Sequence, residues 1–278
     1  LIPGDPARLV AGPQATLEDV QVVREELGLD KPIHEQYITY VTGLLKGDLG
    51  TSLRTKRPVA VEVSNRYANT AKLTLLALAW STIVGVLLGV WSGRHRSRWQ
   101  DYTGMTLAVS GISLPSFWVG FMLIMVFSVN LKWFPTTGAD SLKSLVLPSI
   151  ALGSSIAAII ARFTRSSIIE VLKDDYIRTA RAKGLRERVV VWKHAFRNAM
   201  ISVVTVVGLQ FGFLLGGSVV TESVFAFPGL GSLLVESVNY RDYPAIQSLI
   251  LIFSLHFVVI NLIVDVLYAV LNPEIQLD

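Results

Sequence analysis

Five long apolar segments constrain the fold of this chain more strongly than any other feature of its sequence. They span about residues 73–93, 104–131, 145–161, 199–220 and 248–271. A helix needs about 20 mostly apolar residues to cross the hydrocarbon core of a bilayer. One such segment can be a buried helix of a soluble protein, but a chain of 278 residues with only 17% charged residues cannot hide five from water. The sequence therefore predicts an all-α integral membrane protein with five transmembrane helices.

The basic residues of the loops predict how these helices are oriented, because short loops rich in Lys and Arg stay in the cytoplasm. The loop between the first two segments carries Arg94, Arg96 and Arg98 and is predicted to be cytoplasmic. The loop between the third and fourth segments is the most basic part of the chain and is also assigned to the cytoplasm; it carries Arg165, Lys173, Arg178, Arg181, Lys183, Arg186, Arg188, Lys193 and Arg197. The two remaining loops carry few basic residues and are assigned to the outside.

Alternation of the helices then divides the chain into two parts. Residues 1–70 form an extracytoplasmic helical segment, and residues 71–278 form the transmembrane domain, with a cytoplasmic loop at about 165–198 and a cytoplasmic tail at 272–278. An outside amino-terminal segment needs a signal peptide or an earlier transmembrane helix to carry it across, and residues 1–70 contain neither. We therefore expect a helix before Leu1 in the intact protein, which would give six spans.

The outside segment carries the signals of ordered helices. Thr16 and Asp19 have capping-box spacing, and Gly28 would end the helix that they open. Pro32 suits the first turn of a second helix. We expect the later residues 58–70 to lie near the membrane interface, before the first transmembrane helix.

The sequence lacks the motifs of an enzyme or a metalloprotein. A phosphate-binding GxxxxGK[ST] loop is absent, and the Gly-rich FPGLG at residues 227–231 has no Lys and favours a turn. The four His residues do not have the spacing of a metal site, and Cys is absent. No nucleophile and base are spaced as in a hydrolase. We therefore expect no catalytic residue, no metal site and no cofactor in this chain.

Two ionisable residues lie within the apolar segments, where such residues are rare and often functional. Asp265 is the only acid in the five segments and lies near the inner end of the last one. It can pair with a cytoplasmic Arg or reach interfacial water, or it can take part in translocation. His256 lies closer to the middle of the membrane, where it can bond to a neighbouring helix or contact a transported substrate.

Small residues form a regular pattern in the fourth segment. Gly208, Gly212 and Gly216 recur every four residues on one helical face, which is the spacing of close helix contacts in membranes. One interpretation is tight packing within the chain. The other is a smooth wall of a translocation path, where Gln210 would offer a polar contact.

One charged stretch is similar to a known motif. Residues 174–184 read DDYIRTARAKG and are followed by HAFRN at 194–198, which resembles the EAA loop of bacterial ABC-importer permeases of the dipeptide, oligopeptide, nickel and glutathione group. Arg178 and Thr179 stand where the general EAA pattern has Glu and Ala, as is usual in this group. Further marks of the group run along the whole chain: LIPGDPARL at 1–9, LGLDKP at 27–32, GDLGTS at 47–52, FPGLG at 227–231, RDYPAIQ at 241–247 and NLIVDVLYAVLNP at 261–273.

The resemblance implies a type I ABC-importer permease in the bacterial inner membrane, surrounded by lipid and without a nucleic-acid partner. It implies a second homologous permease, an extracytoplasmic solute-binding protein, and two cytoplasmic ATPases that bind ATP and Mg. Each ATPase would receive one EAA loop. Its ATP-driven closure would then switch the pathway between inward-facing and outward-facing states.

The resemblance assigns the contact with the ATPase to particular residues. They are Asp175, Tyr176, Arg178, Thr179, Ala180, Arg181, Ala182, Lys183 and Gly184. The small residues at 180, 182 and 184 would permit close approach of the partner, and the basic side chains would pair with its acids. A solvated, positive-inside face is the alternative interpretation of these charges. The candidates for the translocation path are Gln210, Gly212 and His256.

The substrate is the least constrained property. The short loop KWFPTTGADS at 132–141 looks more like those of glutathione and nickel permeases than those of dipeptide permeases. VSGIS at 109–113 and GLQFGFLLGGS at 208–218 look closest to the glutathione type. We expect glutathione or a short peptide, with nickel or a nickel chelate as the alternative. A secondary transporter or channel is a further alternative, but the sequence largely lacks the intramembrane charge pairs and broken repeats of that class.

Overall fold

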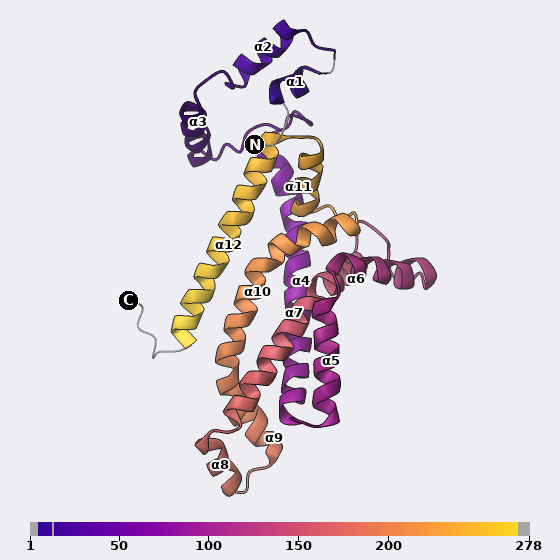
Figure 1. The fold of residues 1–278 in the computed structure, drawn as a ribbon, viewed down its shortest axis with the longest axis vertical. Helices are drawn as coiled ribbons and strands as arrows, with labels where there is room; N and C mark the ends of the chain where they lie inside the picture. Colours follow the sequence, from indigo (N-terminus) through magenta and orange to yellow (C-terminus); the bar gives the residue numbers. More distant parts are fainter. Residues whose placement is uncertain (1–4, 13, 272–278) are drawn as a thin grey trace.

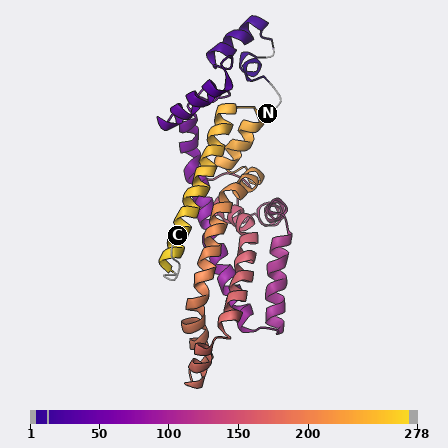
Figure 2. The same cartoon turned by 60° about the vertical axis from the view of Figure 1, so that its left-hand side comes forward.

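The computed structural model describes residues 5–12 and 14–271, and all regular structure in this part of the chain is helical. The elements are α1 (Pro6–Ala11), α2 (Leu17–Glu26), α3 (Ile33–Leu45), α4 (Val59–Arg94), α5 (Trp99–Ser113), α6 (Ser116–Leu123), η1 (Ile124–Asn130), α7 (Leu142–Val171), α8 (Asp175–Ala182), α9 (Glu187–Val189), η2 (Val190–Ala195), α10 (Phe196–Val224), α11 (Leu230–Asn239) and α12 (Tyr243–Leu271). The molecule is elongated, with α1–α3 at one end and α8 and α9 at the other (Figures 1 and 2). The predicted tail at 272–278 lies outside the described residues.

Four helical stretches are long and apolar enough to cross a membrane: Val59–Arg94, Leu142–Val171, Glu187–Val224 and Tyr243–Val266. They contain the first, third and fourth predicted segments and the fifth as far as Val266. α5 and the helix formed by α6 and η1 meet the same criterion only as a pair bent by 100°. The described part of the chain therefore holds four spans, or five if the bent pair counts as one.

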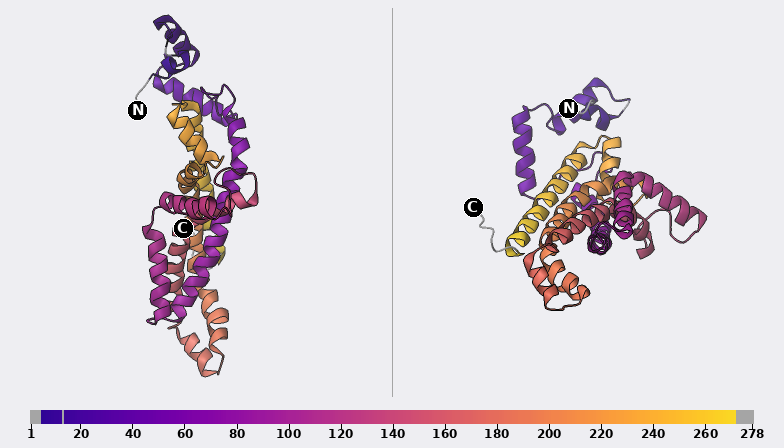
Figure 3. Two further views of the ribbon diagram at one scale, coloured as in Figure 1. Left: turned by 90° about the vertical axis from the view of Figure 1, so that its right-hand side faces the viewer. Right: turned by 60° about the horizontal axis from the view of Figure 1, so that its bottom comes forward.

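The second predicted segment is broken, which corrects the expectation of one continuous helix over residues 104–131. The ring of Pro115 restricts the residue before it to extended backbone, and Leu114 has φ −89° and ψ 125°. The first helix therefore ends at Ser113, and the chain restarts as α6 at Ser116. α6 runs across the long helices instead of continuing α5 (Figures 1 and 3).

α4 is longer than the apolar segment that predicts it. It is one helix of 36 residues, or about 54 Å at 1.5 Å per residue, whereas the hydrocarbon core is only about 30 Å thick. Residues 59–70, which we expect near the membrane interface, form the first turns of this helix. The whole helix is thus longer than the hydrocarbon core is thick.

The contact between α4 and α7 lies at the centre of the molecule. Gly85, Gly89 and Gly93 on α4 face α7 without side chains. An added Cβ at Gly89 would lie 2.5 Å from Thr164 Cβ and 2.6 Å from the carbonyl oxygen of Ala161. The two backbones therefore approach closely, as small residues allow in membranes. α7 is the central helix, with 72% of its apolar window buried within the chain, against 17% for α12.

A buried carboxylate joins three helices at the end of the bundle that carries α11. Glu222, near the end of α10, accepts hydrogen bonds from Thr70 Oγ1 at 2.8 Å and from the backbone N–H of Ser232 at 3.0 Å. The same Thr70 hydroxyl oxygen accepts the backbone N–H of Leu230 at 2.8 Å. Because Leu230 and Ser232 lie in the first turn of α11, the carboxylate also meets the positive end of that helix dipole. These bonds hold α11 against α4.

A second buried carboxylate joins the amino-terminal segment to the membrane helices. Asp242, in the turn before α12, accepts hydrogen bonds from the hydroxyl of Ser52 and from the backbone N–H of Leu53, the latter at 3.1 Å. Asp242 is 2% exposed. The loop that precedes α4 is therefore fastened to the turn that precedes α12.

The amino-terminal helices confirm the sequence prediction. Thr16 and Asp19 form the predicted capping box, in which Asp19 accepts the Thr16 backbone N–H at 2.9 Å. The hydrogen bonds from Thr16 hold the pKa of the Asp19 carboxyl below its usual value. Gly28 has φ +64° just beyond α2, and Pro32 occupies the N-cap position directly before α3.

Candidate functional site

The charged loop at residues 174–198 folds around a small apolar core of its own. Ile177 and Ala180 of α8 pack against Val190 and Ala195 of η2, and all four side chains are buried. α8 turns its charged side chains the other way. The loop is therefore a folded projection at the end of the molecule opposite α1–α3 (Figure 2).

Ala180 lies inside this projection, which corrects the expectation that its small side chain meets a partner directly. Ala180 is 6% exposed, whereas Ala182 and Lys183 are exposed. The small side chain at 180 instead lets α8 approach η2. The outward face of α8 is formed by the other predicted residues of the loop.

Gly184 is required by the backbone conformation at the end of α8. Its φ is +75°, its N–H donates to the carbonyl of Arg181 at 2.9 Å, and the N–H of Leu185 donates to the carbonyl of Ala180 at 3.4 Å. These two bonds form a Schellman motif, whose left-handed position favours glycine. No atom of the described chain lies within 4 Å of a Cβ added at Gly184.

Part of the charge on the loop is balanced within the chain. Arg181 donates to Glu187 from Nη2 at 2.8 Å and from Nε at 3.2 Å, and Arg178 Nη1 lies 3.1 Å from Asp175. Lys183 forms no ion pair with a described residue. Of the three predicted partner-facing cations, only Lys183 therefore has its charge unbalanced by the described part of the chain.

The loop is mechanically continuous with a membrane helix. Asn198 Nδ2, in the first turn of α10, donates to the hydroxyl oxygen of Tyr176 on α8 at 2.8 Å. Partial burial raises the pKa of the Tyr176 phenol, so this hydroxyl is protonated at neutral pH. η2 also runs into α10 without a break. A displacement of α8 would therefore be passed to α10.

The glycines of α10 divide between two environments. A Cβ added at Gly208 would collide with Val264, and one added at Gly212 would lie 3.2 Å from the ring of Phe257, both on α12. An added Cβ at Gly216 has no atom of the described chain within 4 Å. Tight packing within the chain is thus confirmed for Gly208 and Gly212. Gln210 is half-buried on the same helix.

His256 bonds to a neighbouring helix, which confirms one of its two interpretations. Its Nε2 lies 2.6 Å from the hydroxyl of Tyr67 on α4. The pair lies at a cavity of about 160 Å³ that is lined from α4, α10, α11 and α12. Asp265 is exposed on α12 and forms no ion pair with a described residue.

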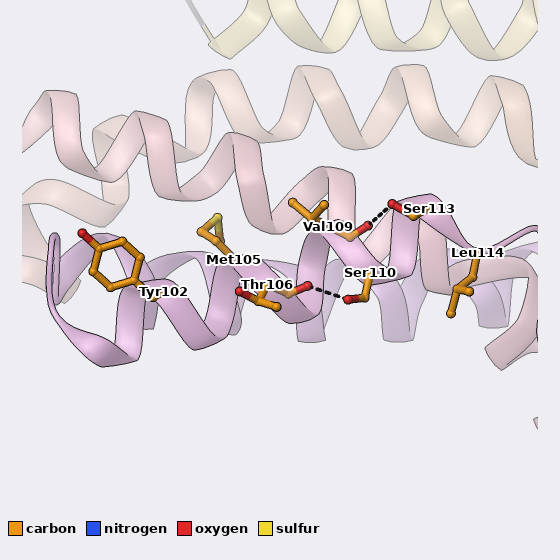
Figure 4. Close-up of a pocket in the computed structure, with 7 residues that line it drawn as sticks. All are labelled: Tyr102, Met105, Thr106, Val109, Ser110, Ser113 and Leu114. Atoms are coloured by element: carbon orange, nitrogen blue, oxygen red, sulfur yellow. Dashed lines mark hydrogen bonds between the residues drawn. The ribbon is translucent and has the colours of Figure 1, made fainter.

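A larger cavity of about 570 Å³ lies on the exposed face of α5 (Figure 4). Its lining residues are Tyr102, Met105, Thr106, Val109, Ser110, Ser113 and Leu114. The hydroxyls of Ser110 and Ser113 donate to the carbonyls of Thr106 and Val109 at 2.8 and 2.9 Å. These two hydroxyl hydrogens are therefore used within the helix, and the lining is mostly apolar.

Comparison with known families accounts for nearly the whole chain. The family described as "Binding-protein-dependent transport system inner membrane component" matches residues 85–277. Its amino-terminal counterpart, the family described as "Binding-prot-dependent transport system membrane comp, N-term", matches residues 1–74. The chain belongs to this family. It is thus a permease component of a binding-protein-dependent transport system of the inner membrane, and it crosses that membrane several times.

Relatives of the permease are named as glutathione permeases. It is 55% identical over 276 residues to the glutathione transport system permease protein GsiC of Escherichia coli (strain K12), which covers 99% of this chain and 90% of the relative. The protein of the same name from Salmonella choleraesuis (strain SC-B67) has the same identity and coverage.

Solved structures show the fold of the permease. A structure of the MetNI methionine ABC transporter in inward-facing conformations matches with a TM-score of 0.67 and 17% identity, over 76% of this chain and 96% of that one. An amino acid ABC transporter matches with a TM-score of 0.59, over 75% of this chain and 93% of that one. The type I ABC-importer permease fold predicted from sequence is confirmed.

Several polar residues of the permease interior could not be identified from sequence patterns. Glu222 lies just beyond the fourth predicted segment, so Asp265 is not the only acid in a membrane helix. Asp101, 3% exposed at the start of α5, forms an ion pair with Arg165 on α7. Tyr67 also lies outside the apolar segments. The side-chain partners of Glu222, Asp101 and Tyr67 lie 64 or more residues away in sequence, so no local sequence pattern indicates these pairs.

Proposed function

We propose that this permease forms half of a translocation pathway that imports glutathione or a short peptide, with energy supplied by ATPase subunits. The substrate proposal rests on the 55% identity to glutathione permeases over 99% of the chain. Identity at this level over both the amino-terminal and the transmembrane parts favours a shared substrate class. It disfavours the nickel alternative.

The proposed assembly holds a second homologous permease, two cytoplasmic ATPases and an extracytoplasmic solute-binding protein. ATP and Mg would be bound by the ATPases and not by this chain. α10 and α12 leave an apolar surface on which such a membrane partner can pack, because only 28% and 17% of their apolar windows are buried within the chain. Lipid or a second permease must cover the remainder.

In the proposed coupling, the loop at residues 165–198 transmits the closure of the ATPases. Asp175, Tyr176, Arg178, Thr179, Arg181, Ala182, Lys183 and Gly184 would form the contact, and Ala180 would support it from inside. The bond between Tyr176 and Asn198 supports this role, because it ties the projecting helix to α10.

The proposed orientation places residues 1–70 outside and the coupling loop in the cytoplasm. The separation of α1–α3 from α8 and α9, at opposite ends of the long helices, supports it (Figure 1). The translocation path would pass Gln210, Gly212 and His256. The cavity beside His256 and Tyr67 supports the last of these residues.

The experiment is uptake by the complex reconstituted in liposomes with its binding protein. Labelled glutathione, a labelled dipeptide and radioactive nickel are supplied in turn, with and without ATP. We expect ATP-dependent uptake of glutathione or the dipeptide and none of nickel. Nickel uptake would contradict the substrate, and uptake without ATP would contradict the mechanism.

A paired variant tests the coupling loop. Lys183→Glu reverses the one charge of the contact that no described residue balances, and Lys143→Glu is the matched reversal in the first turn of α7. We expect Lys183→Glu to lower ATP-driven uptake by about tenfold or more, because a desolvated charge pair becomes a repulsive one. Equal uptake by the two variants would remove Lys183 from the contact.

A further inference from the structure

A basic cavity of about 370 Å³ lies where the turn between α4 and α5 meets the end of α7. It is lined by Arg96, Arg165, Ser166, Ile169, Glu170 and Lys173. Three cations and one carboxylate thus converge on one space. The cavity precedes the predicted contact residues 175–184 of the coupling loop, and none of them lines it.

The guanidinium group of Arg165 forms one wall of the cavity and is held in place by an ion pair. Arg165 donates from Nε and Nη2 to the two carboxylate oxygens of Asp101, at 2.5 and 2.7 Å. Asp101 is itself held by the hydroxyl of Ser92 at 2.6 Å and by the backbone N–H of Ser97 at 3.0 Å. Arg165 Nη1 makes no hydrogen bond with a described residue. A donor held in place in this way loses little conformational entropy when it binds an anion.

The excess charge of the cavity comes from two other residues. Arg96 and Lys173 are exposed and form no ion pair with a described residue. Asp101 balances Arg165, and Glu170 offsets one of the two remaining cations. An anion between Arg96 and Lys173 would therefore find a net positive surface and a free Arg165 N–H.

Aromatic side chains place this cavity at the level of the lipid headgroups. Trp91 and Trp99 flank Arg96 in sequence, and their rings meet edge to face with centroids 6.3 Å apart. Trp99 and Tyr102 are 68% and 67% exposed. Exposed Trp and Tyr side chains at the ends of membrane helices mark the membrane–water interface.

The cavity on α5 offers room for a hydrocarbon chain next to this site. It begins at Tyr102, the residue after Asp101, and continues to Leu114 (Figure 4). Twelve residues of helix span about 18 Å. The hydroxyls of Ser110 and Ser113 are bonded within the helix, so they do not oppose contact with a hydrocarbon.

We propose that Arg96, Lys173 and Arg165 bind the phosphate of an anionic phospholipid, whose acyl chain lies along α5. The ligand class follows from the position: a phosphate site at the depth of the interfacial aromatic residues, beside an apolar groove, matches a lipid better than a soluble anion. Basic sites of this kind between cytoplasmic helix ends bind anionic headgroups. The site goes beyond the proposed transport function and does not depend on its substrate.

The test uses the whole importer complex, purified in detergent and offered equal amounts of phosphatidylglycerol and phosphatidylcholine. Native mass spectrometry then counts the lipids that remain bound. We expect the unaltered complex to retain phosphatidylglycerol preferentially. In the double variant R96Q/K173Q that preference should fall about tenfold, since each basic side chain near the surface contributes an appreciable share of the attraction.

Matched variants make the result specific. R186Q/R188Q removes two exposed cytoplasmic charges outside the cavity and should leave the preference unchanged. Val109→Trp fills the α5 cavity and should lower retention of both lipids. Unchanged preference in R96Q/K173Q would overturn the proposal. So would binding of inorganic phosphate without retention of phosphatidylglycerol, which would indicate a soluble anion, or loss of the ATPases from R96Q/K173Q with lipid retention intact, which would indicate a protein contact.

Discussion

At the scale of single residues, there are two explanations for the glycine at position 184, one based on side-chain size and one on backbone conformation. The loop resemblance suggests that a small side chain admits a partner, whereas the structure shows a left-handed backbone with φ +75° and free space around the missing Cβ. Asn accepts the left-handed conformation far better than Ala does, although it is larger. Conformation and size therefore make opposite predictions for these two substitutions.

We expect Gly184→Ala to loosen the end of α8, while Gly184→Asn largely preserves it. The left-handed conformation costs Ala about 1–2 kcal/mol. Hydrogen exchange of the Leu185 amide, which bonds to the carbonyl of Ala180, should accordingly be about 5–30-fold faster in the Ala variant. Equal protection in the two variants would contradict the conformational reason, and loss of the ATPases from both would favour the size reason.

A second residue-scale prediction concerns Glu222. Glu222→Ala would leave the Thr70 hydroxyl and the Ser232 N–H without their shared acceptor in a fully buried site. Each buried polar group left unpaired costs about 1–3 kcal/mol, so for the two groups we expect a loss of about 2–6 kcal/mol in the free energy of unfolding. Thermal unfolding of the purified permease measures it. Thr205→Ala, which removes a hydroxyl bonded only within α10, is the control and should cost far less.

At the scale of helices, Gly89 of α4 and Gly216 of α10 both belong to glycine repeats of the sequence but lie in different surroundings in the structure. Gly89→Ala would place a Cβ 2.5 Å from Thr164 Cβ, between two backbones that have little room to separate. We expect a loss of about 1–3 kcal/mol, the range for overpacking a core. Gly216→Ala has no atom of the described chain within 4 Å and gains helix propensity, so it should be neutral or stabilising. The comparison is made by denaturation of the permease in detergent, and similar losses in both variants would disprove it.

The same elements show what the sequence could and could not reveal. Apolar length was sufficient for four spans, because a helix that must cross a bilayer needs little else. The break before Pro115 was visible in the sequence but was outweighed by the apolar residues on both sides. The pairing of Asp101 with Arg165 was not visible, because 64 residues separate them and only the packing of α5 on α7 brings them together. The loop motif identified the family, but its internal core at Ile177 and Ala180 emerged only from the fold.

At the scale of the whole molecule, the two family matches meet at α4, and the structure fastens their parts together at a distance from that junction. The amino-terminal match ends at residue 74 and the transmembrane match begins at residue 85, both within α4. If α4 were the only connection, the residues before it could move as a unit relative to the transmembrane helices. The bonds from Ser52 and Leu53 to Asp242 prevent this, because Asp242 belongs to the turn between α11 and α12.

The last prediction follows from this fastening. Asp242→Ala should release the loop before α4 while leaving the contact between α4 and α7 intact, since Asp242 touches neither helix at that contact. Limited proteolysis should then cut the loop at 46–57 several-fold faster, with little change in the thermal unfolding of the transmembrane part. Asp140→Ala, which removes an acid from the loop before α7, is the matched control. In this variant the loop at 46–57 should be cut at the same rate as in the unaltered protein. If Asp242→Ala instead lowers the unfolding temperature as strongly as Gly89→Ala, the two parts of the chain unfold as one unit, and the carboxylate supports the bundle itself.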